Sequence, residues 1–147
     1  MKTCATLQSP KRSPRRSSPS RLNPGADAAP LIYVVDDVPE LAALYTVLLE
    51  LAGCAVMAFT DRADAPAALG ADAAKPDLLI TDYLNSSMPV DPFLENCRLF
   101  HPELRILMIS GVGGRDASFA RVRPDRFLAK PFAGDRFQKE VHAALLG

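Results

Sequence analysis

The feature that most constrains this chain is a short apolar run that ends in a carboxylate, Asp77-Leu78-Leu79-Ile80-Thr81-Asp82. Three large apolar residues followed by a β-branched residue indicate a strand buried on both faces, as in a parallel sheet. In open α/β sheets, the functional site lies just beyond the carboxyl ends of the strands. The run therefore predicts that Asp82 is carried to a functional site.

Helical patterns alternate with apolar runs along the rest of the chain, which predicts a doubly wound α/β fold. It would have a five-stranded parallel sheet with helices on both faces. The other four strands are expected at 31–35, 54–59, 104–109 and 126–129. Five helices are expected. The first runs from Pro39 to a stop at Gly53, the second follows a cap at Thr60 or Asp61, and the third has its cap at Asp91 and Pro92 as its first residue. The fourth is expected near 116–122, and the fifth begins at about Asp135.

Apolar spacing in the first and last helices predicts which side of each faces the core. For the first helix the predicted inner residues are Leu41, Leu44, Tyr45, Leu48 and Ala52. For the last helix they are Phe137, Val141, Ala144 and Leu145.

Polar residues stand at the ends of four of the predicted strands. They are Asp36, Asp37, Asp82, Ser110 and Lys130. Taken singly, an Asp-Asp pair is more often a turn and helix cap, and a Ser-Gly or Lys-Pro pair usually just ends a strand. Together they occupy the same end of different strands, where three carboxylates would repel unless a cation is present. An all-oxygen cluster suits Mg²⁺, and metal, ammonium and hydroxyl together suit phosphoryl transfer, with an aspartate as nucleophile.

From residue 30 to about 146, the sequence resembles the receiver domain of two-component response regulators. The matching stretches are Val34-Val35-Asp36-Asp37, Ile80-Thr81-Asp82, Met108-Ile109-Ser110-Gly111 and Phe127-Leu128-Ala129-Lys130-Pro131-Phe132. The resemblance implies a flavodoxin-like sheet with strand order 2-1-3-4-5.

The resemblance also implies a role for each matching residue. Asp82 would be the phosphoacceptor, and Asp37 would bind Mg²⁺ directly while Asp36 does so largely through water. The backbone carbonyl of Leu84 would complete the metal ligands. Ser110 would be the switch hydroxyl, and Lys130 the lysine of a cis Lys-Pro motif. Phe127 would be the switch aromatic, either with a mobile rotamer or as a strand residue packed under the last helix.

The loop after Asp82 departs from the family pattern. Receivers usually have Met-Pro three residues after the phosphoacceptor, but here Asn85-Ser86 stand there and Met88-Pro89 come three residues late, so the geometry of Asn85–Pro89 is open. The short Gly-rich segment after Ser110 suggests an altered output face. Leu84 and Val112 are apolar and could not orient an attacking water, which predicts slow hydrolysis of a phosphorylated Asp82.

Charge divides the chain into a basic tail, residues 1–29, and an acidic receiver body, residues 30–147. The tail has six Lys or Arg and one Asp, which gives +5, and the body therefore carries −5. The Ser, Pro and Arg content of the tail predicts that the tail is disordered. It could bind nucleic acid or an anionic membrane, act as a transit peptide, tether an acidic partner, or be a solvated leader. Three cysteines without CxxC spacing, and no apolar run long enough to span a bilayer, favour the cytoplasm.

These features favour a phosphoacceptor receiver that is not an enzyme. It would take its phosphoryl group from a histidine kinase or histidine phosphotransfer protein and signal by docking to an unknown downstream protein, with no direct DNA binding by the body. No output module follows the body, so a single-domain regulator is expected. The alternative is a pseudo-receiver that is not phosphorylated. A haloacid-dehalogenase-like phosphohydrolase is less favoured, because Val38 stands where that family has a second Asp.

Overall fold

A computed structural model of the chain describes residues 28–71, 75–83, 89–111 and 122–147. Five parallel strands form one sheet in the order β3-β2-β4-β5-β6. The strands are β2 (Leu31–Val35), β3 (Ala55–Phe59), β4 (Leu78–Asp82), β5 (Arg105–Ser110) and β6 (Arg126–Ala129). Counted along the chain, this order is 2-1-3-4-5, which confirms the predicted doubly wound sheet.

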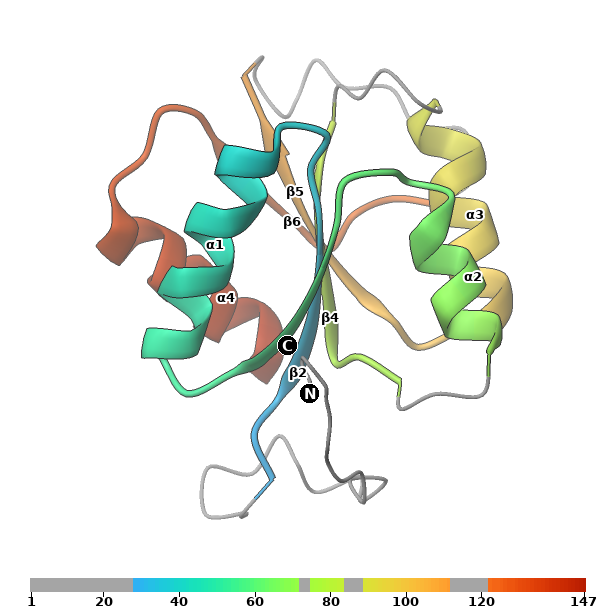
Figure 1. Ribbon diagram of the computed structural model, residues 1–147, viewed down its shortest axis with the longest axis horizontal. Helices are drawn as coiled ribbons and strands as arrows, with labels where there is room; N and C mark the ends of the chain where they lie inside the picture. The colour runs from blue at the N-terminus through green and yellow to red at the C-terminus, as the bar shows by residue number, and fades with distance from the viewer. Residues whose placement is uncertain (1–27, 72–74, 84–88, 112–121) are drawn as a thin grey trace.

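In the part of the chain that the structure describes, two helices cover each face of the sheet (Figure 1). The helix predicted near 116–122 falls almost entirely outside the described residues. The four described helices are α1 (Pro39–Leu51), α2 (Asp64–Gly70), α3 (Val90–Phe100) and α4 (Gly134–Leu146). Helices α1 and α4 pack together on one face, and α2 and α3 pack together on the other. Within the described ranges, no helix has the length and apolarity needed to cross a membrane.

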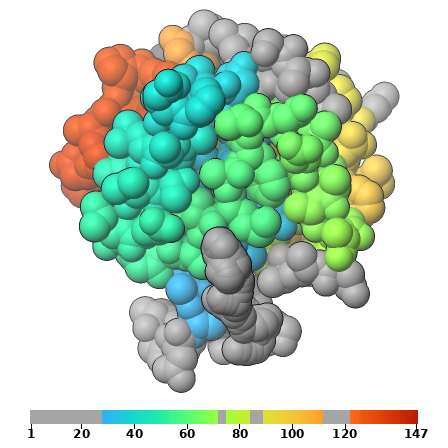
Figure 2. All heavy atoms as spheres, in the orientation of Figure 1, coloured from blue at the N-terminus to red at the C-terminus, as the bar shows by residue number. Residues whose placement is uncertain are grey.

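The sheet separates two apolar cores because successive residues of a strand point to opposite faces. Ile32 and Ile80 belong to the core under α1 and α4, whereas Tyr33 and Leu79 belong to the core under α2 and α3. All five residues of β2 are buried, as expected for a strand with neighbours on both sides. At the sheet edge, β3 is only half-buried; it lies with α1 and α2 on the face shown in Figure 2.

The predicted starts of two helices are wrong by two or three residues. Helix α2 begins at Asp64, because the carboxylate of Asp61 accepts a hydrogen bond of 3.0 Å from the Ala63 N–H and so closes a turn first. Its Pro66 lies in the first turn, where N–H groups have no intrahelical partner in any case. Helix α3 begins at Val90, so Asp91 lies inside its first turn rather than at its cap.

The predicted inner face of α1 is partly wrong. The helix begins at Pro39 as predicted, and Tyr45 is buried, but Leu44 is 49% exposed and Leu49 is fully buried. Apolar residues occur almost all round this helix, so their spacing alone does not identify the side that packs on the sheet.

The predicted inner face of α4 is confirmed for all four residues. Its largest member, Phe137, stacks on Tyr45 of α1 at 5.2 Å between ring centroids and on Phe132 at 5.8 Å. Tyr45 also stacks on Phe132 at 6.1 Å. We call Tyr45, Phe132 and Phe137 the aromatic stack; it joins α1 to α4 and to the segment after β6.

A partly buried carboxylate fixes the start of β2, because Asp77 Oδ2 accepts a hydrogen bond of 2.9 Å from the Leu31 N–H. We expect Asp77→Ala to lower the free energy of unfolding by about 1–3 kcal/mol, since it leaves a partly buried N–H without its acceptor. Urea unfolding followed by circular dichroism measures this loss. Asp77→Asn keeps an acceptor oxygen and should lose less; equal losses for the two variants would contradict the explanation.

Candidate functional site

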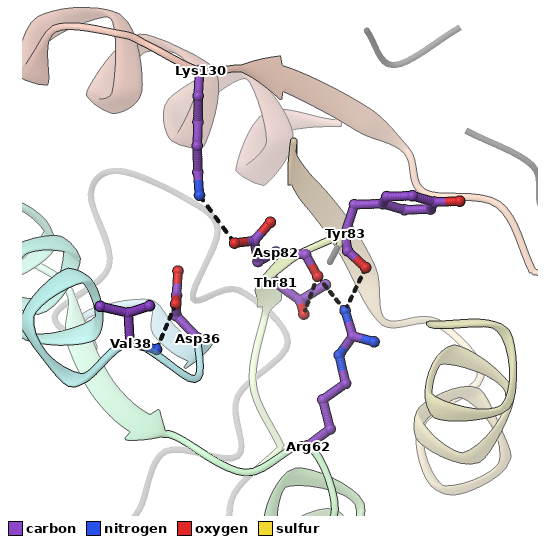
Figure 3. Close-up of polar contacts among 7 residues, drawn as sticks. All are labelled: Asp36, Val38, Arg62, Thr81, Asp82, Tyr83 and Lys130. Atoms are coloured by element: carbon purple, nitrogen blue, oxygen red, sulfur yellow. Dashed lines mark hydrogen bonds and ion pairs between the residues drawn. The ribbon is translucent and has the colours of Figure 1, made fainter. Parts of the chain in front are cut away.

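The centre of the candidate site is an ion pair between the ends of two strands. Asp82 is the last residue of β4, and Lys130 directly follows β6. Lys130 Nζ lies 3.0 Å from Asp82 Oδ2, with the two side chains 30% and 12% exposed (Figure 3). The peptide bond between Lys130 and Pro131 is cis, as the resemblance implied. The structure therefore brings together the carboxylate and the ammonium that the sequence placed at separate strand ends.

A second carboxylate, Asp36, lies beside this pair just after β2. Its Oδ1 accepts a hydrogen bond of 2.9 Å from the Val38 N–H, and the residue is 1% exposed. Burial raises the pKa of Asp36, and the hydrogen bond from the Val38 N–H opposes this shift. The nearby charges of Asp82 and Asp37 also raise this pKa, while that of Lys130 lowers it. Three acids and one base thus act on one another electrostatically at this end of the sheet.

The predicted switch residues occupy neighbouring strands. Ser110 ends β5, is buried, and its carbonyl accepts a hydrogen bond of 2.8 Å from the Lys130 N–H. Phe127 lies in β6, opposite Met108 of β5, and is partly buried. It packs on the core under α2 and α3, which is the face opposite α4. The prediction that Phe127 packs under the last helix is therefore wrong, because β6 directs Phe127 to the other side of the sheet.

The predicted metal ligands are partly described. Among the residues with a described position, no three His, Cys, Asp or Glu side chains are arranged to hold a metal ion. The chemistry of the site nevertheless fits a hard cation: Oδ2 of Asp36 is buried and has no hydrogen-bond partner in the described structure, and hard divalent ions prefer such carboxylate oxygens. Three parts of the prediction lie outside the described residues: Leu84, residues 85–88 of the segment Asn85–Pro89, and Val112.

One functional candidate, Arg62, was missed by the sequence analysis. It follows β3 in the turn before α2, is fully buried, and donates hydrogen bonds to the carbonyls of Asp82 and Tyr83 (Figure 3). The available signal was weak: Arg62 is the one basic residue between Cys54 and Ala74, and it follows a strand at the same edge as the acids.

Curated relatives match the body of the chain. The C4-dicarboxylate transport transcriptional regulatory protein DctD of Rhizobium meliloti is 29% identical over 119 residues, which is 80% of this chain. The nitrogen assimilation regulatory protein NtrX of Azorhizobium caulinodans is 30% identical over 118 residues, or 78% of this chain. The match spans 25% and 26% of these relatives, about a quarter of their length. No protein-family model matches the chain.

Solved structures match the fold over nearly their whole length. A response regulator receiver protein from Sinorhizobium medicae aligns with a TM-score of 0.70 at 26% identity, covering 81% of this chain and 96% of that one. The chain folds as a response regulator receiver domain. The chemotaxis response regulator CheY4 of Vibrio cholerae aligns with a TM-score of 0.69 at 21% identity, covering 80% of this chain and 99% of its own.

A third matching structure was solved with bound ligands. The response regulator protein TrrA of Thermotoga maritima, described in complex with Mg²⁺ and BeF, aligns with a TM-score of 0.66 at 18% identity, covering 78% of this chain and 98% of its own. These matches confirm the resemblance that the strand-end motifs indicate. In the receiver fold of this chain, the Asp82–Lys130 pair lies at the carboxyl edge of the central strand β4.

Proposed function

We propose that this receiver domain takes a phosphoryl group onto Asp82 from a histidine kinase or histidine phosphotransfer protein. The observation that carries the proposal is the 3.0 Å pairing of Asp82 with Lys130, beside the buried Asp36. An isolated carboxylate at a strand end would be a cap or a turn residue. A carboxylate that is mostly buried, paired with an ammonium and next to other acids is placed for charge-controlled chemistry.

Asp36, Asp37 and Asp82, with the backbone carbonyl of Leu84, would hold Mg²⁺. Support comes from the unpartnered Oδ2 of Asp36, which is buried among negative charges and gains from a nearby cation. Bound Mg²⁺ supplies positive charge that offsets the negative charge of the phosphoryl oxygens. The TrrA complex described with Mg²⁺ and BeF supports the same assignment by analogy.

The residues of the chain then have distinct roles in the transfer. A carboxylate oxygen of Asp82 attacks the phosphorus of the donor phosphohistidine, the phosphorus–nitrogen bond breaks, and its electron pair stays on the imidazole. The product is an acyl phosphate on Asp82. Lys130 Nζ, already 3.0 Å from this carboxylate, neutralises charge on the transferred group.

Ser110 and Phe127 are proposed to convert this modification into a change of surface. The hydroxyl of Ser110 comes from the end of β5, the strand that pairs with β4, and could donate to a phosphoryl oxygen on Asp82. Phe127 lies in β6, the strand that pairs with β5. A shift of Ser110 would therefore change the packing of the Phe127 ring. Signalling would proceed by docking to a downstream protein rather than by enzymatic turnover.

The proposal is tested by incubating the full chain with acetyl phosphate and Mg²⁺ and measuring its intact mass. We expect the addition of one phosphoryl group, labile to hydroxylamine as an acyl phosphate is, and mapped to Asp82 by peptide analysis. Chelating the metal with EDTA should prevent the addition. An unchanged mass with both acetyl phosphate and a kinase donor would instead identify a pseudo-receiver.

Replacing Lys130 tests the electrostatic part of the mechanism. Removing one preorganised charge or donor from a site of this kind slows reactions by roughly 10²- to 10³-fold, so Lys130→Met should slow phosphorylation by about that amount. Lys130→Arg keeps the positive charge and should fall between Lys130→Met and the natural protein. Initial rates with acetyl phosphate at saturating Mg²⁺ measure the effect. A Lys130→Met rate equal to that of the natural protein would exclude Lys130 from the mechanism.

A further inference from the structure

Arg62 is unusual because it is a charged side chain with no exposed surface. The only other buried charged residue among those described is Asp36, which lies in the proposed site. Arg62 belongs to neither helix nor strand; it stands between β3 and α2, two residues before the helix begins. Burying a guanidinium is costly unless its donors find acceptors, so its contacts indicate what keeps it inside.

The contacts of Arg62 are with the backbone at the end of β4. Its Nη2 donates to the carbonyl of Asp82 and, at 3.0 Å, to the carbonyl of Tyr83. The guanidinium carbon lies 5.2 Å from the centre of the Phe93 ring, which adds a cation–π contact from α3. The same peptide segment is held from the other side, because the Tyr83 N–H donates to the carbonyl of Ile109 at 2.8 Å.

Arg62 and Lys130 therefore approach Asp82 from opposite sides and act on different atoms. Lys130 contacts the carboxylate, whereas Arg62 contacts the main-chain carbonyl of the same residue (Figure 3). Burial lowers the pKa of Arg62 to about 10, and the charges of Asp82, Asp37 and Asp36 oppose this shift. The guanidinium is thus protonated at neutral pH, and its charge partly offsets that of the acids above it.

We propose that Arg62 is a positioning residue that fixes the Asp82–Tyr83 backbone and thereby holds the Asp82 carboxylate at the angle needed to attack phosphorus. The inference rests on the proposed function, because it takes Asp82 as the phosphoacceptor. A loosened peptide at Asp82–Tyr83 would therefore change the direction from which the carboxylate attacks.

The test compares Arg62→Met, Arg62→Lys and Arg105→Met in the full chain. Arg105 is a matched control: it also donates to a backbone carbonyl, that of Ala144 at 3.2 Å, but it begins β5 at the opposite end of the sheet from Ser110. Small misplacements of reacting groups can cost up to 10²-fold, so Arg62→Met should slow phosphorylation by acetyl phosphate by about tenfold or more. Arg62→Lys keeps a charged donor and should recover part of the rate, and Arg105→Met should react like the natural protein.

Two spectroscopic readouts separate positioning from simple structural support. The carbonyl ¹³C shifts of Asp82 and Tyr83 should move in Arg62→Met and stay unchanged in Arg105→Met. In the natural protein, scalar couplings across the hydrogen bonds should link the Arg62 guanidinium nitrogen to these two carbonyls. If Arg62→Met does not fold, the couplings and the Arg62→Lys rate decide the matter.

The outcomes distinguish this inference from the proposed function. A natural protein that takes no phosphate refutes the proposed function, and the carbonyl shifts and couplings then test the backbone contact alone. A folded Arg62→Met protein that is phosphorylated at the natural rate with unmoved Asp82 and Tyr83 carbonyl shifts overturns the inference. So would the absence of the couplings in the natural protein.

Discussion

The Asp82→Asn variant is expected to accept no phosphoryl group from acetyl phosphate or from a kinase donor. The side-chain amide is not a nucleophile, whereas its shape is close to that of the carboxylate and its oxygen can still accept a hydrogen bond from Lys130. The fold should therefore persist. Neutralising Asp82 also removes one of the charges that raise the pKa of Asp36, so the cost of ionising Asp36 falls.

Intact mass measures this loss, and circular dichroism shows that the fold is retained. The control is Asp125→Asn, because Asp125 lies near the opposite end of β5, where its Oδ2 accepts from the Ile106 N–H at 2.8 Å. This control should be phosphorylated at the natural rate. If Asp82→Asn still gained one phosphoryl group, another residue would be the acceptor, and the proposed chemistry would be wrong.

The largest expected loss of stability follows Phe137→Ala. Phe137 is fully buried and contacts both other members of the aromatic stack, so its removal leaves a cavity where α1, α4 and the segment after β6 meet. Phe→Ala changes in a core typically cost about 3–5 kcal/mol of unfolding free energy. That is a large fraction of the roughly 5–15 kcal/mol that stabilises a domain.

Urea unfolding monitored by far-ultraviolet circular dichroism gives the unfolding free energies. Leu146→Ala is the matched control, since Leu146 lies in the same helix and is 62% exposed. It should change stability by less than about 0.5 kcal/mol, as for most surface substitutions. Similar losses for both variants would mean that the aromatic stack does not hold α4 in place.

The strands and the site acids could be predicted because one physical rule governs both. Strands buried on both faces read as apolar runs, and parallel strands deliver the residues that follow them to one edge. As expected, the carboxylate of Asp82 therefore lies next to the ammonium of Lys130, the residue after β6. The roles of these residues in phosphorylation stay predictions.

Three features could not be predicted, because the sequence carries no pattern for them. Leu44 and Leu49 are equally apolar, so only packing against the sheet decides that Leu49 is the buried one. In β6, Phe127 and Leu128 are adjacent and both apolar, and alternation leaves open which of them faces α4. Arg62 is a single base in a turn, and its burial follows from carbonyl positions that exist only in the folded chain.

The sheet keeps the two apolar cores apart, and this has a consequence for how the molecule can diverge. Tyr45 and Phe137 belong to one core, and Phe93 and Leu94 to the other. Free-energy changes at distant sites without shared partners usually add. A substitution inside one core therefore needs no compensating change in the other core, and the sequences of the two helix pairs can change independently during evolution.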